Sequence, residues 1–229
     1  MRELLLIRHG QASFGAEDYD QLSPSGEQQS RLLGEWFATT GARPDEVAMG
    51  PRVRHRDTAT LCLDAAGLAL KPMVLPGLDE VDHHELLARL RPELSAPGAL
   101  RAAMSQTDDP HRAFQRLFTA ALARWVSGEY DADYTRSWSE FRAEVLATLH
   151  LLADSPGDTL WAFTSGGPIS VIVGALLGTP EAQAFQLSWP LVNTGVTRLR
   201  LGSRGPVLVT YNAWPHLERA GESALVTLR

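Results

Sequence analysis

The chain has 229 residues, of which 44% are hydrophobic and 21% are charged. This is the composition of a globular protein, and it excludes a disordered, collagen-like or coiled-coil chain. The 21 Lys and Arg residues against 27 Asp and Glu residues give a net charge of −6. That balance argues against binding to nucleic acid or to an anionic membrane, because both require positive charge. The single cysteine, Cys62, excludes an intramolecular disulfide and a cysteine-based zinc site.

The apolar segments are short. No run is long enough to span a bilayer, and Leu4–Ile7 ends at Arg8, which is too early for the core of a signal peptide. We therefore expect a cytoplasmic protein without membrane partners.

Buried strands and amphipathic helices alternate along the chain. Leu4–Ile7 is a fully apolar run, typical of a strand covered on both faces of a parallel sheet. Leu160–Phe163 repeats this pattern, and Pro168 shortly after it indicates the start of a helix. Further strands are expected at Glu46–Met49, Met73–Leu75, Val196–Leu201 and Val207–Tyr211, and further helices after Ser25, over Arg54–Ala66 and from Trp138 to Leu152.

This alternation predicts an α/β layered domain with a mostly parallel sheet. The block from about His84 to Tyr134 contains no convincing strand and is punctuated by Pro92, Pro97 and Pro110. We expect one domain over residues 1–229, with a helical cap inserted at about 84–135.

Candidate functional residues follow the two most apolar strands. The first strand ends in Arg8-His9-Gly10-Gln11, and the second ends in Thr164-Ser165-Gly166-Gly167. Ligands of open α/β sheets bind at the carboxyl ends of strands. These two segments are therefore predicted to share a site.

Two other segments carry dense charge. Arg52, Arg54 and Arg56 begin a predicted helix, but they do not share one face, so at most two of them can point at a common site. The segment 78–85 holds four acids with His83 and His84. Adjacent histidines diverge on a helix, which argues against a metal site and leaves a carboxylate general acid as the hypothesis.

Together these segments resemble the histidine phosphatase superfamily, also called the phosphoglycerate-mutase-like superfamily. The resemblance begins with Leu-Ile-Arg-His-Gly-Gln at residues 6–11 and extends over nearly the whole chain. It implies a three-layer α/β/α sandwich with a mostly parallel central sheet and a helical cap insertion. The other matching segments are Leu22–Gln29, Pro51–Ala59 with Arg54 at the second arginine, Leu78–Glu80, and Asn212–Leu217.

By this resemblance, His9 is the nucleophile that carries the phosphoryl group, and Arg8 and Arg54 grip its oxygens. Glu80 protonates the leaving alcohol and then activates water. Ser165 and the amide of Gly166 complete the phosphate pocket. The implied protein is a phosphatase of small phosphomonoesters that needs no metal or other cofactor and also binds inorganic phosphate. Arg52 and Arg56 are rivals for the second arginine, and Asp79 and Asp82 for the acid.

The sequence departs from this pattern at two positions. Family members usually read Ser-His-Gly-Gly at the second strand end, whereas Ser165 stands at the histidine position here. Loss of one transition-state donor typically costs about 10²–10³ in rate. We expect Ser165 to be either a phosphate donor or a helix cap, with His83 or His84 as compensating histidines. Gly15 stands where true mutases usually carry asparagine.

These departures keep two alternatives open: a phosphate-binding pseudo-enzyme, suggested by Ser165, and a mutase, which Gly15 and Ser165 both disfavour. Three of the other histidines are expected on the surface or on a helix face, and His216 in a structural role. These three are His55, His111 and His150.

Overall fold

The computed structural model describes residues 2–13, 20–96 and 98–228. Within them the strands form one six-stranded sheet, in the order β3-β2-β4-β1-β5-β6. The first four of these are parallel, β5 pairs antiparallel with β1, and the edge strand β6 pairs antiparallel with β5. The mostly parallel sheet is as predicted. The strands are β1 (Glu3–Arg8), β2 (Glu46–Met49), β3 (Met73–Val74), β4 (Thr159–Thr164), β5 (Val196–Gly202) and β6 (Gly205–Ala213).

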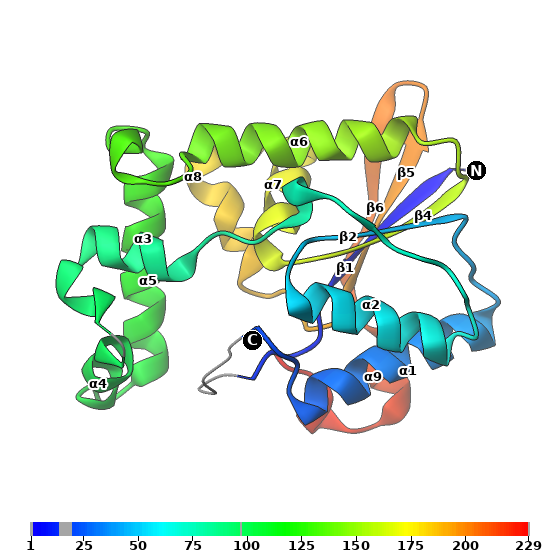
Figure 1. Cartoon of the computed structure of the whole chain (residues 1–229), viewed down its shortest axis with the longest axis horizontal. Coiled ribbons are helices and arrows are strands. Elements are labelled where there is room, and N and C mark those ends of the chain that lie inside the picture. The colour runs from blue at the N-terminus through cyan, green and yellow to red at the C-terminus, as the bar shows by residue number, and fades with distance from the viewer. Residues whose placement is uncertain (1, 14–19, 97, 229) are drawn as a thin grey trace.

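Helices cover both faces of the sheet, as Figure 1 shows. Helices α1, α2 and α9 lie on one face, and α6 and α7 lie on the other. The helices are α1 (Pro24–Thr40), α2 (Val53–Ala65), α3 (His83–Leu90), α4 (Ala99–Ser105), α5 (Pro110–Val126), α6 (Trp138–Asp154), α7 (Gly166–Leu177), α8 (Glu181–Ala184) and α9 (Pro215–Ala220). Short 3₁₀ turns occur at Pro76–Leu78, Pro92–Ser95, Asp131–Asp133, Phe185–Ser188 and Ser223–Leu225.

The apolar run of β1 feeds two separate cores. Leu4 and Leu6 pack into the core beneath α6 and α7, whereas Leu5 and Ile7 pack into the core beneath α1 and α2. Side chains of a strand alternate between faces, so a strand covered on both sides must be apolar throughout. The fold is therefore the expected three-layer α/β/α sandwich.

The segment between β3 and α6 is helical and contains α3, α4 and α5. In Figure 1 these helices stand to one side of the sheet. Trp125 near the end of α5 anchors this segment, because its ring packs edge-on against Trp138 of α6 with centroids 5.3 Å apart. Among the described residues, no helix has the length and apolar character needed to cross a membrane.

Candidate active site

His9 follows directly on β1, at the carboxyl edge of the sheet. Its backbone N–H donates to the Thr164 carbonyl at 2.9 Å, and its carbonyl accepts from the side-chain amide of Asn193 at 3.1 Å. The side chain is buried, and its Nδ1 atom lies 2.7 Å from the Gly10 carbonyl oxygen. Because a carbonyl oxygen only accepts hydrogen bonds, Nδ1 carries the proton and Nε2 keeps its lone pair.

The surroundings of His9 disfavour its cationic form. Burial is the largest cause that lowers its pKa well below the usual 6.5, and the charges of Arg54, Arg8 and His55 lower it further. The hydrogen bond to Gly10 opposes this shift without reversing it. His9 is therefore a neutral imidazole with one nitrogen available for attack.

Of the three arginines at the start of α2, the structure buries Arg54 near His9. Its guanidinium pairs with Asp20 at 2.8 Å, and its side chain is only 5% exposed. Arg52 instead binds Asp79 at 2.6 Å, and Arg56 is exposed. The first turn of a helix cannot direct all three side chains to one point. Arg54 is the buried one, and it is therefore the second arginine of the candidate site.

Arg8 is held by backbone carbonyls. Its Nη1 atom donates to the carbonyls of Leu191 and of Leu228, the latter at 2.9 Å. These contacts join the end of β1 to the segment before β5 and to the C-terminal segment. The positive charge remains close enough to lower the pKa of His9.

Glu80 is the carboxylate of the acid segment that reaches the second strand end. It is buried, with Oε2 accepting from the Gly167 amide at 3.3 Å and Oε1 accepting from the Val81 amide at 2.9 Å. Its two rivals are used elsewhere. Asp79 binds Arg52, and Asp82 caps α3 by accepting from the amides of His84 and Glu85.

Ser165 occupies the N-cap position of α7, but its hydroxyl makes no capping hydrogen bond. It is fully buried and lies 2.7 Å from Nε2 of His55 instead. Of the two expectations for His55, a surface residue or a helix-face residue, the first is wrong, because its side chain is 0% exposed on the buried face of α2. Gly166 follows Ser165 as the buried first residue of α7.

The histidine that bonds Ser165 is His55 and not one of the two expected to compensate for it, although His83 is near enough to Glu80 and Arg54 for their charges to act on its pKa. His84 is exposed, and His83 packs edge-on against Phe118 with ring centroids 5.0 Å apart. His216 is buried and bonds Thr194 Oγ1 at 2.8 Å, and burial lowers its pKa to about 3. His150 is exposed, as expected. The side chain of His111, like residue Gly15, lies outside the described part of the structure.

Sequence reasoning missed four residues that build this site. His55 had a signal: it precedes Ala59 by four residues and Cys62 by seven, which places all three on one helical face. Thr58 accepts from the Gly10 amide at 2.9 Å, and it was visible only as part of the resemblance. Asp20 and Asn193 carried no sequence signal.

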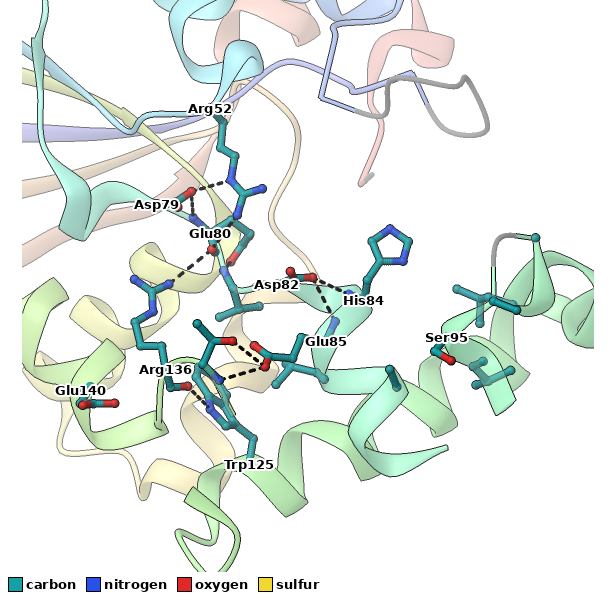
Figure 2. Close-up of a pocket in the computed structure, with 18 residues that line it drawn as sticks. Arg52, Asp79, Glu80, Asp82, His84, Glu85, Ser95, Trp125, Arg136 and Glu140 are labelled. Carbon is teal, nitrogen blue, oxygen red and sulfur yellow. Dashed lines mark hydrogen bonds and ion pairs between the residues drawn. The ribbon is translucent and has the colours of Figure 1, made fainter. Parts of the chain in front are cut away.

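A cavity of about 1050 Å³ opens between the acid segment and the cap. Figure 2 shows Arg52, Glu80 and Arg136 around its inner end, where Arg136 donates to the Glu80 carbonyl at 3.5 Å. Trp125 lines it from α5. The lining includes Glu80 but not His9, so the cavity adjoins the site through the acid. Over the described ranges, no cluster of three His, Cys, Asp or Glu side chains is placed to hold a metal ion.

Comparisons with known proteins place the chain among phosphoryl-transfer enzymes. Over 80 residues it is 39% identical to the 2,3-bisphosphoglycerate-dependent phosphoglycerate mutase of Thermobifida fusca, a match that spans 32% of each chain. The matched part is thus only about a third of that curated relative.

Solved structures agree in fold over a much larger share. A variant of phosphoserine phosphatase from Entamoeba histolytica in complex with phosphoserine has a TM-score of 0.61 and 22% identity, covering 95% of this chain and 100% of its own. Phosphoglycerate mutase from Bacillus anthracis has a TM-score of 0.65 and 14% identity, covering 96% and 97%. The family described as "Histidine phosphatase superfamily (branch 1)" matches residues 4–213. The chain therefore belongs to the histidine phosphatase superfamily.

Proposed function

We propose that the protein is a metal-independent phosphatase that hydrolyses a small phosphomonoester through a phosphohistidine on His9. The observation that carries this proposal is the state of the His9 imidazole. Its Nδ1 proton is held by the Gly10 carbonyl, its pKa is depressed by burial and by two arginines, and its Nε2 is left as a nucleophile.

Each proposed step has a residue in a suitable position. The Nε2 lone pair attacks phosphorus, and the bond from phosphorus to the ester oxygen breaks while Glu80, in its acid form, gives that oxygen a proton. Glu80 then takes a proton from water, whose oxygen attacks phosphorus and displaces His9. Arg8, Arg54, Ser165 and the Gly166 amide would bind the phosphoryl oxygens, whose negative charge is spread in the transition state.

The cap would select the alcohol part of the substrate. The cavity between the cap and Glu80 adjoins the residue proposed to protonate that alcohol. We extend the proposal to the domain organisation: one domain over 1–229, in which the helical segment at about 84–135 serves as the substrate-selecting cap.

The test is hydrolysis of p-nitrophenyl phosphate in the presence of a chelator, by the wild type, by His9→Ala and by His150→Ala as an exposed control. We expect turnover in the wild type and in His150→Ala, and none in His9→Ala. An alkaline quench should show a mass increase of one phosphoryl group on the wild type and on His150→Ala but not on His9→Ala, because phosphohistidine survives in base. Equal hydrolysis rates in the wild type and His9→Ala would overturn the proposal.

Mutase activity is the second candidate, favoured by the identity shared with the Thermobifida fusca enzyme. Incubating the protein with 3-phosphoglycerate and a trace of 2,3-bisphosphoglycerate distinguishes the two functions. Formation of 2-phosphoglycerate faster than release of inorganic phosphate would assign a mutase. Binding of inorganic phosphate without either reaction would assign the phosphate-binding pseudo-enzyme that Ser165 suggests.

A further inference from the structure

We propose that His55 and Ser165 act as a pair, in which the His55 imidazole orients the Ser165 hydroxyl so that it donates a hydrogen bond to the phosphoryl group on His9. His55 is then a positioning residue, because it acts on the substrate only through the serine. This inference rests on the proposed function of the site.

The contact between the two residues is short and inaccessible to solvent. His55 Nε2 and Ser165 Oγ are 2.7 Å apart, and both side chains are 0% exposed. A serine at an N-cap position normally accepts from the backbone of its own helix, yet Ser165 makes no such bond. Its hydroxyl is therefore oriented by His55 and not by the helix.

The pair also lies next to the nucleophile. The rings of His9 and His55 have centroids 5.7 Å apart and are inclined at 44°. Ser165 directly follows Thr164, whose carbonyl holds the His9 amide at 2.9 Å. His9 and Ser165 thus leave the ends of two neighbouring parallel strands together.

The backbone makes room for the His55 ring at Gly50. A Cβ atom added at Gly50 would lie 2.3 Å from Nδ1 and 2.7 Å from Cε1 of His55, so the imidazole occupies the volume that a side chain at position 50 would need. A larger residue at position 50 would therefore displace the ring from its place beside Ser165. By the resemblance described above, Ser165 stands at a histidine position, and here the imidazole that meets it comes from His55 of α2.

The protonation state of His55 determines whether the Ser165 hydroxyl can donate a hydrogen bond. Burial first, and then the charges of Arg54 and Arg52, lower the pKa of His55 well below 6.5, and a hydrogen bond with the Gly50 backbone opposes this shift without reversing it, so the ring is neutral with one N–H. When that proton is on Nε2, it satisfies the serine oxygen and frees the hydroxyl proton for a phosphoryl oxygen. A bound phosphoryl group favours this arrangement, because its negative charge attracts the donated proton.

The test compares five variants in p-nitrophenyl phosphate hydrolysis: His55→Ala, Ser165→Ala, the double variant, His55→Gln, and His55→Ala combined with Ser165→His. We expect each alanine variant to lower kcat by about 10²-fold with a much smaller change in KM, as for loss of one transition-state donor. The double variant should be no worse than either single variant, because the residues act as one unit.

Two variants restore the donor by different routes. His55→Gln keeps an N–H near the Nε2 position and should retain most of the activity. Ser165→His in the His55→Ala background returns the imidazole to α7 and should recover at least tenfold over His55→Ala. Inhibition by orthovanadate should weaken in parallel with kcat across the series, an effect that loss of packing alone would not produce.

The outcomes separate this inference from the proposed function. If His9→Ala abolishes hydrolysis while His55→Ala and Ser165→Ala keep wild-type kcat, the pairing is wrong and the phosphatase stands. Additive losses in the double variant would also overturn the pairing. If His9→Ala keeps full activity, the proposed function itself fails. His55→Gln and Ser165→Ala keep the test decisive if a variant carrying His55→Ala does not fold.

Discussion

The side-chain amide of Asn193 donates to the backbone carbonyl of His9 at 3.1 Å, from the segment that precedes β5. Asn193 is itself fully buried and accepts from Thr227 Oγ1 at 2.9 Å. The next residue, Thr194, holds a left-handed backbone conformation with φ of 60°, which is rare for a β-branched residue. Its amide also reaches the carbonyls of Arg8 and His9. The nucleophile is therefore supported from behind by a strained, fully buried segment, a combination typical of functional sites.

This support predicts the behaviour of Asn193→Ala. The His9 carbonyl would lose a buried donor, so the free energy of unfolding should fall by about 1–3 kcal/mol. The looser His9 backbone should also lower kcat at least about tenfold, because small displacements of a nucleophile are costly. Denaturant titration and p-nitrophenyl phosphate kinetics measure the two effects. Thr227→Val is the control: it disturbs Asn193 but keeps the bond to His9, so it should lower stability with little change in kcat. Wild-type kcat in Asn193→Ala would contradict the prediction.

Glu80→Gln tests which step needs the acid. A p-nitrophenolate leaving group needs little protonation, whereas an alkoxide needs it fully, and general acid catalysis contributes about 10²–10⁴. The rate of phosphoryl transfer to His9 should therefore fall much more for an alkyl phosphate than for p-nitrophenyl phosphate, as measured by the pre-steady-state burst.

Asp82→Asn provides the matched control for Glu80→Gln, because Asp82 caps α3 from the same segment. Asparagine caps a helix about as well as aspartate, so this variant should change stability little and leave the leaving-group dependence unchanged. Equal losses with both substrates in Glu80→Gln would show that Glu80 is not the proton donor.

The order of elements and the sheet were predictable because the signals are local. Runs such as Leu4–Ile7 and Leu160–Phe163 must be buried on both faces, and the structure pairs them residue by residue from Leu4 with Leu160 onward. The hairpin at the C-terminal side extends further than predicted, over β5 and β6, and its register shifts between Val196 and Leu199 carried no sequence signal.

The composition of the pocket was less predictable, because it depends on contacts between segments distant in sequence. His55 and Ser165 are 110 positions apart, and Arg54 with Asp20 is 34 positions apart. When each motif is considered alone, a serine in place of a histidine indicates only that a phosphate-binding side chain has been lost. Only the three-dimensional structure shows that another imidazole meets it.

Buried histidines predict how stability depends on pH. His9, His55 and His216 all have pKa values lowered by burial, to about 3 for His216. Below pH 6.5 these histidines bind protons in the unfolded chain but not in the folded chain. Their contribution to the free energy of unfolding is therefore fully present above pH 6.5 and is lost as the pH falls. His216 alone should contribute up to about 1.4 kcal/mol per pH unit between 6.5 and about 3.

Urea titrations at about pH 7.5 and about pH 5.5 measure this dependence in a range where most carboxylates are still charged. His216→Gln should reduce the slope, and His150→Gln, an exposed control on α6, should leave it unchanged. A protein that becomes more stable on acidification in this range would contradict the assignment of neutral buried histidines.

Gly167→Ala should move Glu80 without unfolding the protein. A Cβ atom at this position would lie 2.2 Å from Oε1 of Glu80, so the carboxylate must shift and its bond to the Gly167 amide at 3.3 Å is broken. The atom displaced is the end of a flexible side chain, and alanine favours a helix over glycine by about 1 kcal/mol, so stability should change little. Turnover of an alkyl phosphate should nevertheless fall at least about tenfold, because the proton donor is displaced.

Gly174→Ala is the control on the same helix. Its Cβ would lie 2.8 Å from Cβ of Ala184, far along α7 from Glu80. That clash is with a short, rigid side chain, so this variant should lose stability and keep its turnover per folded molecule. The two variants should therefore show opposite patterns, with activity lost in one and stability lost in the other. Equal activity losses in both would mean that strain anywhere in α7 disables the site, and full activity in Gly167→Ala would separate Glu80 from the chemistry.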